Sequence, residues 1–307
     1  MDNVLVIGAT GRHGRTGSAV VDELLATGRH VRVLTRADDE RAAALRQRGA
    51  TTVIGDLHDR RSLVDAVDGV AAVYFTYPIA AGVIPAATNL ASVLVDAARP
   101  VHVVVMSMAA SAHGSPSKLG QAQAVAEEVL IWAGLNPTIL RVAGLFHENV
   151  LTLHGGTIRA DATIANSFGE GRAPWIGGCD AAELAVAELL KPAPSAPAIS
   201  YPPAAEALSH SDVARIISEE TGRYVRYQSI SPEAWRAQLE ARAETDDSPV
   251  NRAMAQHISI IGGAFAGGAA PRITPDADTL ATALGHPPAR FVDFVREHRD
   301  AFSETAA

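Results

Sequence analysis

The sequence contains little sulfur, few aromatic rings and no long apolar run. Cys179 is the single cysteine, which excludes a disulfide framework or a cysteine-rich metal site and favours a reducing compartment. No segment reaches the roughly 18 apolar residues that a membrane-spanning helix needs. The first residues lack the pattern of a signal peptide. We therefore expect a cytoplasmic protein that has no membrane partner.

Clustered positive charge and metal-binding histidine patterns are also lacking. The formal net charge of the 307 residues is −8, which argues against a nucleic-acid partner because such partners usually need a basic face. The 11 histidines form neither an H-x-x-x-H nor an H-E-x-x-H pattern, so no metal site is predicted. Aromatic residues make up only 5% of a chain that is 48% hydrophobic. Aliphatic side chains and alanine must therefore fill the core.

Short β-branched runs alternate with helical stretches in the first half of the chain. Strands are expected at residues 4–7, 31–34, 52–54, 72–75, 101–106 and 138–140, with helices between them. This alternation predicts an α/β fold, a Rossmann-type doubly wound parallel sheet, in residues 1–142. Residues 143–307 are expected to form mainly a smaller α/β substrate lobe, with some segments returning to the first domain. Within them, the glycine- and alanine-rich stretch 262–270 resembles a mobile loop.

A glycine-rich segment, GATGRHGRTG, joins the first strand to the first helix. Glycine there permits a tight turn and close approach to a pyrophosphate, and the helix start offers free N–H groups. A glycine-rich turn that binds nothing is the alternative. The loop carries about three extra residues, so either Gly14 or Gly17 makes the close helix–strand contact. The predicted cofactor-binding residues of this loop are Gly8, Thr10, Gly11, Arg12, Gly14 and Gly17.

The end of the second strand predicts which dinucleotide binds. NAD-preferring folds place an acidic residue there, whereas this chain has Arg36, which suits the 2′-phosphate of NADP(H). A solvated surface arginine is the alternative. Asp56, after the third strand, is expected to meet the adenine amino group or to cap the next helix. Tyr77 and Pro78, after the fourth strand, are assigned to the cofactor site.

Several segments, in this order, resemble the NmrA-like branch of the atypical short-chain dehydrogenases/reductases. These segments are VIGATG at 6–11, LTR at 34–36, GDL at 55–57, VYFTYP at 73–78, VVMSM at 104–108, AEEVLIWAGLNPTILRVAGLFHEN at 126–149, PWI at 174–176 and the stretch 274–302. The resemblance implies a Rossmann domain with a small α/β lobe and NADP(H) in the cleft between them. Members of the family include quinone reductases, other NADPH-dependent reductases and redox-sensing regulators.

The catalytic Tyr-x-x-x-Lys pair of ordinary short-chain reductases does not occur in this sequence. Leu119 and Gln123 stand at the tyrosine and lysine positions, and neither can donate a proton to a carbonyl as that pair does. The remaining catalytic candidates are Ser107, Asn149 and His113. Ser107 either binds a substrate oxygen or caps the strand end, and the stretch with Asn149 either lines the cleft or begins a helix. His113 is a candidate acid in a loop where histidines are usually solvent-exposed.

Several apolar and aromatic residues are candidates for the substrate pocket, although core packing is the usual role of such side chains. The candidates are Met108, Phe146, His147, Trp175 and Phe265. We predict an NADPH-dependent reductase that passes a hydride to a small quinone-like or other electron-poor substrate. The alternatives are a non-catalytic NADP(H)-binding redox sensor and a tailoring enzyme that uses the cleft for non-redox chemistry. A homodimer is compatible with the sequence.

Overall fold

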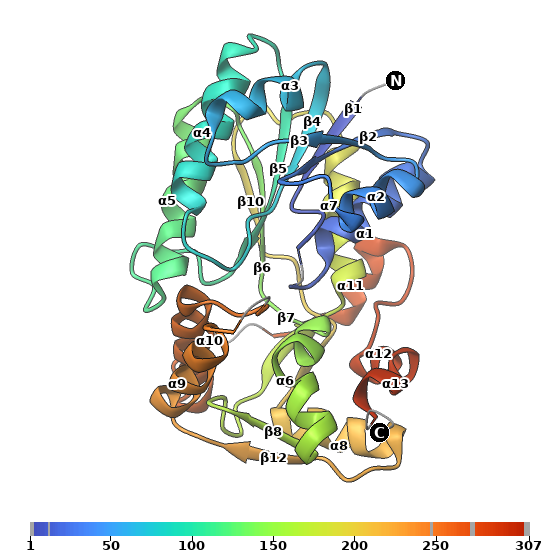
Figure 1. The fold of residues 1–307 in the computed structure, drawn as a ribbon, viewed down its shortest axis with the longest axis vertical. Helices are drawn as coiled ribbons and strands as arrows, with labels where there is room; N and C mark the ends of the chain where they lie inside the picture. The colour runs from blue at the N-terminus through green and yellow to red at the C-terminus, as the bar shows by residue number, and fades with distance from the viewer. Residues whose placement is uncertain (1–2, 12, 246–247, 271–273, 304–307) are drawn as a thin grey trace.

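The computed structural model describes residues 3–11, 13–245, 248–270 and 274–303. Within these ranges, one sheet of seven strands is parallel throughout and has the order β10-β6-β5-β4-β1-β2-β3 (Figure 1). Its strands are β1 (Asn3–Ile7), β2 (His30–Thr35), β3 (Thr51–Ile54), β4 (Val70–Phe75), β5 (His102–Met108), β6 (Thr138–Val142) and β10 (Ala198–Ser200). The strand order reverses between β1 and β4, which confirms the predicted doubly wound α/β fold.

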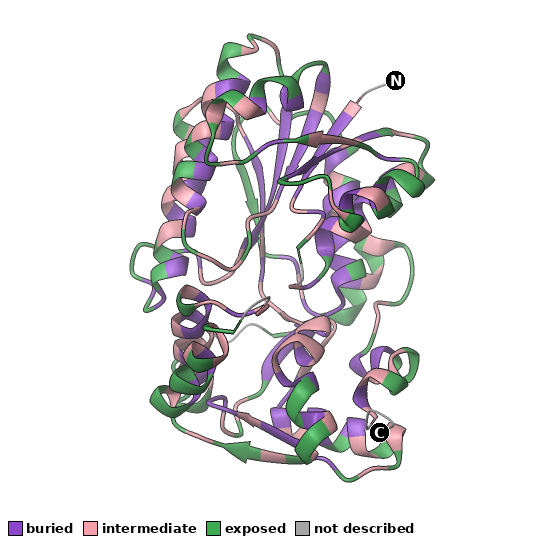
Figure 2. Cartoon of the chain, in the orientation of Figure 1, coloured by how far each residue is buried: buried purple, intermediate pink, exposed green. Residues whose placement is uncertain are grey.

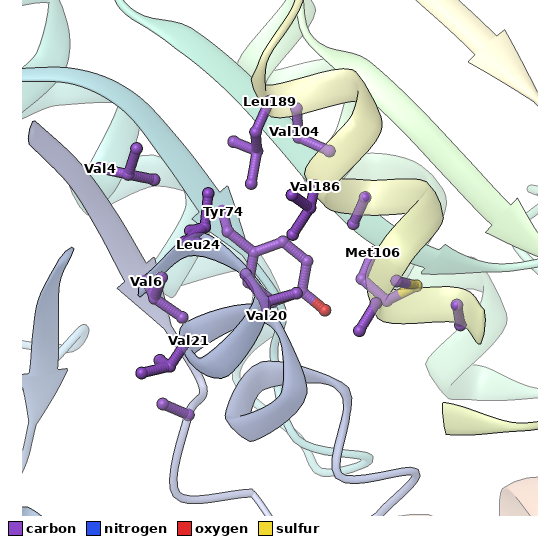
Figure 3. Close-up of a cluster of buried hydrophobic side chains, with 14 of the residues drawn as sticks. Val4, Val6, Val20, Val21, Leu24, Tyr74, Val104, Met106, Val186 and Leu189 are labelled. Atoms are coloured by element: carbon purple, nitrogen blue, oxygen red, sulfur yellow. The ribbon is translucent and has the colours of Figure 1, made fainter. Parts of the chain in front are cut away.

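Helices cover both faces of this sheet, which explains why its strands are almost continuously apolar. The helices of this part are α1 (Thr16–Ala26), α2 (Glu40–Gln47), η1 (Arg60–Leu63), α3 (Val64–Val67), α4 (Val83–Asp96), α5 (Lys118–Trp132) and α7 (Gly178–Leu189). Figure 3 shows α1 and α7 packed on one face, where Leu24 and Val186 meet Val6 and Tyr74. Successive strand residues point to opposite faces, so neighbours such as Leu5 face the second core, under α3, α4 and α5. Figure 2 shows the sheet strands mostly buried and the outer sides of the helices exposed.

Side-chain caps determine where several helices begin. Asp39 accepts hydrogen bonds from the first backbone N–H groups of α2, and Ser117 accepts from Gly120 at the start of α5. Each cap satisfies backbone donors that a helix leaves unpaired at its start. No helix in the described ranges combines the length and the apolar composition that crossing a bilayer requires.

The second half of the chain forms a smaller lobe below the carboxyl edge of the large sheet (Figure 1). Two small sheets, β11-β9-β7 and β12-β8, lie in this lobe, and two aromatic-rich cores hold it together. The strand β10 and the helices α7 and α11 (Ala277–Leu284) nevertheless belong to the large sheet and its cover, since Leu280 of α11 packs in the same core as α7. The remaining elements are β7 (Leu145–Phe146), α6 (Glu148–Asp161), β8 (Thr163–Asn166), β9 (Ala173–Ile176), β11 (Glu206–Leu208), α8 (His210–Thr221), β12 (Arg226–Ser229), α9 (Pro232–Arg242), α10 (Arg252–Ala266), α12 (Phe291–Glu297) and α13 (Arg299–Phe302).

The prediction of a mobile loop at 262–270 is wrong for its first half, because α10 continues to Ala266. A Cβ atom on Gly262 would lie 2.5 Å from Ser167 Oγ, and one on Gly263 would lie 2.8 Å from a side-chain carbon of Pro232. The two glycines therefore allow α10 to pack closely on its neighbours. This tertiary packing outweighs the cost of about 1 kcal/mol that glycine carries in a helix relative to alanine.

Candidate functional site

A cavity of about 280 Å³ opens at the carboxyl ends of the central strands, beside the point where the strand order reverses. Ligands of open α/β sheets bind at this place. The structure brings eleven of the sequence-predicted site residues to its wall. They are Gly8, Thr10, Gly11, Gly17, Arg36, Asp56, Tyr77, Pro78, Ser107, Met108 and Phe146.

The glycine loop forms one wall of this cavity and needs glycine at two points. A Cβ atom on Gly8, whose φ is +92°, would overlap the side chain of Thr76. A Cβ atom on Gly17 would lie 2.5 Å from the carbonyl oxygen of Gly8. Gly17, the second residue of α1, therefore makes the close helix–strand contact, which the sequence left open between Gly14 and Gly17.

The second lobe holds the far side of the glycine loop. The backbone N–H of Gly14 donates to Oδ1 of Asn149 at 3.2 Å. A Cβ atom on Gly14 would lie 2.6 Å from the ring of Phe146, so the ring packs directly on this glycine. The loop is thus fixed by the residues that begin α6, and Phe146 contributes both to this contact and to the cavity wall.

Two guanidinium groups line the cavity at the ends of β2 and the start of α2. Arg36 was predicted, and Arg41 lies in the first turn of α2. Arg41 donates from Nε and Nη2 to Oδ2 of Asp39 at 3.0 and 2.7 Å, and this guanidinium lowers the pKa of the Asp39 carboxyl. Asp38 turns away to pair with Arg46 at 2.7 Å. The carboxylate of Asp38 is therefore paired with Arg46 and is not among the groups that line the cavity beside Arg36 and Arg41.

Asp56 and Tyr77 line the same region from neighbouring strand ends. Oδ1 of Asp56 accepts from the backbone N–H of His58 at 2.9 Å. The next helix, η1, is capped by Asp59, so the alternative role of Asp56 as its cap does not hold. The hydroxyl of Tyr77 donates to the carbonyl of Ala81 at 3.1 Å and contacts Nε2 of His58 at 2.8 Å. Burial raises the pKa of Tyr77, so its phenol stays neutral.

Ser107 lies on the cavity wall at the end of β5 and is tied to a buried carboxylate. Its hydroxyl donates to Oε1 of Glu127 in α5, which also accepts from Ser111 at 2.9 Å. The other oxygen, Oε2, accepts from Nε and Nη2 of Arg141 at 3.1 and 2.5 Å. Gln123, one turn before Glu127, also lines the cavity.

Several predicted site residues lie elsewhere. His113 is exposed and pairs with Glu128 at 2.8 Å, and Asn149 is used by the glycine loop. Neither is among the residues that line the cavity, so the structure does not support a direct catalytic role for either. Arg12 lies outside the described residues.

Three of the predicted pocket residues pack against aromatic rings of the second lobe and are not among the residues that line the cavity. Trp175 is buried and donates from Nε1 to the carbonyl of Leu208 at 3.1 Å. His147 is buried against Trp175, with ring centroids 6.4 Å apart, and burial lowers its pKa to about 3. Phe265 stacks on Phe168 at 5.7 Å. The cores of this small lobe are built largely from aromatic side chains, and these residues are therefore needed for packing inside the lobe.

Arg41, His13 and the buried Glu127 were missed by the sequence interpretation. A signal existed for Arg41, because Asp39 is a helix-capping residue type and places Arg41 in the first helical turn beside the strand end. His13 lines the cavity and contacts the carbonyl oxygen of Pro249 at 2.9 Å. No local pattern predicts a contact between residues so far apart in the sequence.

Comparison with known proteins agrees with this architecture. The chain is 29% identical to the NAD(P)H azoreductase of Xenophilus azovorans, over 97% of this chain and 99% of that protein. The structure resembles the NADPH-dependent quinone oxidoreductase QOR2 of Escherichia coli, with a TM-score of 0.78 and 20% identity over 96% and 99% of the two chains. It also resembles the triphenylmethane reductase of Citrobacter sp., with a TM-score of 0.77 and 21% identity over 96% and 99%. The sequence profile of the NmrA-like family matches residues 1–280, and the chain therefore belongs to the NmrA-like family.

Proposed function

We propose that this protein is an NADPH-dependent reductase that acts on a small, electron-poor acceptor such as a quinone. The observation that carries the proposal is the composition of one cavity. A glycine loop at a helix start, the cations Arg36 and Arg41, and a wall with Ser107 and Phe146 all face the same space. The azoreductase similarity over nearly the whole chain supports a reductase.

The glycine loop fits the pyrophosphate of a dinucleotide. Side chains at positions 8 and 17 would collide with the protein backbone or with Thr76. The turn is therefore compact and carries no side chain at these two positions. The first turn of α1 contains no acidic residue, which preserves the partial positive charge of the helix start for an anion. Gly8, Gly11 and Gly17 are the residues that we assign to the pyrophosphate.

Arg36 and Arg41 are assigned to the 2′-phosphate of NADPH. A guanidinium group suits phosphate because it donates paired hydrogen bonds in a plane. Asp38, the acidic residue nearest the strand end, is engaged by Arg46 and is therefore not placed to bind ribose hydroxyls. This arrangement favours NADPH over NADH.

When bound, NADPH would supply a hydride. The apolar side chains of Pro78, Met108 and Phe146 would shield the acceptor from water. Leu119 is buried and Gln123 carries no acidic proton, so α5 provides no counterpart of a tyrosine acid. An acceptor whose reduced oxygens take protons from water fits such a site, and positioning alone can contribute several kcal/mol to the rate. A plain ketone, which needs a proton donor, fits it poorly.

Turnover with stereospecifically deuterated NADPH tests the proposal. We expect deuterium in the reduced product of a quinone or an activated alkene, or a primary isotope effect on its reduction, and little reaction with plain ketones. Tight NADPH binding without label transfer to any acceptor would contradict a reductase and favour a redox sensor. Efficient reduction of plain ketones would contradict the absence of a proton donor.

A further inference from the structure

The hydrogen of the Ser107 hydroxyl is oriented by a hydrogen bond to the buried side chain of Glu127. Ser107 is 8% exposed and lines the cavity from the carboxyl end of β5. A serine hydroxyl has one hydrogen to donate and two lone pairs that accept. Its single hydrogen is donated away from the cavity, to Oε1 of Glu127. Only lone pairs of this oxygen are then left for a ligand.

The surroundings of Glu127 keep this direction fixed. The carboxylate is 1% exposed, and a buried carboxylate needs its hydrogen bonds satisfied. Oε2 faces the guanidinium of Arg141, which donates two hydrogen bonds to it. Oε1 receives the hydroxyls of Ser107 and Ser111. Glu127 thus faces four donor groups, and turning the hydrogen of Ser107 toward the cavity would remove one of them.

We propose that Ser107 acts as a hydrogen-bond acceptor that selects ligands carrying an N–H or O–H group, with Glu127 as its positioning residue. This inference rests on the proposed function, because it assumes that the cavity holds a nicotinamide and an acceptor. It also sharpens that function. An acceptor carbonyl placed against Ser107 would meet lone pairs, whereas an amide or hydroxyl substituent would form a hydrogen bond there.

Two sources can supply the donor, namely the carboxamide of the cofactor and a substituent of the substrate. The cofactor source is tested by comparing NADP⁺ with its 3-acetylpyridine analogue, in which a methyl group replaces the carboxamide nitrogen. The substrate source is tested by comparing a quinone carboxamide with the matching acetylquinone. The two members of each pair differ by an NH2 group in place of a methyl group and hardly differ in shape.

For the wild-type protein we expect one of these pairs to be discriminated by about tenfold in favour of the amide, the size of one net hydrogen bond. The difference appears in Kd for the cofactor pair or in KM, with little change in kcat, for the substrate pair. Ser107→Ala should abolish the preference. Ser111→Ala is the matched control and should retain it, because Ser111 donates to the same oxygen of Glu127 but is not among the residues that line the cavity.

Glu127→Gln gives a result that a merely structural role would not produce. Arg141 requires an oxygen opposite it, so the amide nitrogen of the new side chain would face Ser107. That nitrogen donates, and the hydrogen of Ser107 would turn into the cavity. The preference should then reverse, with the acetyl member of the pair bound more tightly than the amide.

The outcomes separate this proposal from the function on which it rests. If NADPH binds and is turned over but neither pair is discriminated in the wild type, or if Ser107→Ala leaves the preference unchanged, the acceptor role is wrong while the reductase function stands. If the protein binds no NADP(H), both proposals are wrong. Should Glu127→Gln fail to fold, the comparison of wild type, Ser107→Ala and Ser111→Ala still decides the question.

Discussion

Replacing Arg36 with alanine should weaken NADPH binding and leave NADH binding nearly unchanged. A hydrogen bond to a charged group contributes about 1.5–3 kcal/mol, and the exposure of Arg36 on the cavity wall reduces this through solvent screening. We therefore expect a loss of about 1–2 kcal/mol, a factor of roughly 5–30 in Kd. The effect should shrink as salt is raised, because exposed charges are screened over about 10 Å at 0.1 M.

Arg41→Ala should have a smaller effect on NADPH, about 0.5–1 kcal/mol or roughly 2–5-fold in Kd. Two of its donor groups are already given to Asp39. Asp39→Asn keeps an oxygen to cap α2 but removes the competing charge. NADPH should then bind more tightly, by about twofold, which corresponds to a few tenths of a kcal/mol.

Calorimetric or fluorescence titration of each variant with NADPH and NADH provides the measurement. Arg48→Ala is the matched control, because Arg48 stands at the end of α2, pairs with Asp22 at 2.7 Å and does not line the cavity. The reasoning fails if Arg48→Ala weakens NADPH as much as Arg36→Ala does. It also fails if Arg36→Ala weakens both cofactors equally, since only NADPH carries the 2′-phosphate.

Three further predictions concern the loop, its support and the buried histidines. Gly17→Ala should abolish cofactor binding, because the new Cβ would lie 2.5 Å from a backbone oxygen. The control Gly156→Ala adds a Cβ that has nothing within 4 Å, so this variant should bind the cofactor normally. Titration with NADPH compares the two variants. Asn149→Ala should raise the Kd for NADPH about fivefold, since about 1 kcal/mol of loop support is lost; an unchanged Kd with a large fall in kcat would instead restore the catalytic role. Burial lowers the pKa of His147 and of His154 from the ordinary 6.5 to about 3. Below pH 6.5 the unfolded chain therefore binds more protons than the folded protein does. As the pH drops from 6.5 toward 3, each of these histidines should lower the free energy of unfolding by up to about 1.4 kcal/mol per pH unit. Urea denaturation between pH 7 and pH 5 measures this slope, and a flat profile would contradict it.

The site could be predicted from the sequence where its residues follow a strand directly. Gly8, Arg36 and Ser107 each stand at a strand end, and the carboxyl ends of parallel strands meet at one edge of a sheet. The sequence was less reliable where a residue type has two uses. Trp175 and Phe265 have the character of pocket residues, but their contacts are with other buried aromatic rings.

The sequence by itself determined the doubly wound sheet and the glycine loop, because hydrophobic periodicity and glycine spacing are local properties, and the order of its motifs showed the resemblance to the NmrA-like family. Tertiary structure alone decided what each polar side chain faces. Asn149 was recognised as a site residue, but only folding brings it to Gly14, 135 positions earlier. The orientation of the Ser107 hydroxyl likewise depends on Glu127 and Arg141, which come from a helix and the next strand. Such contacts join residues far apart in the chain, and their directions are set by packing, which no local pattern records.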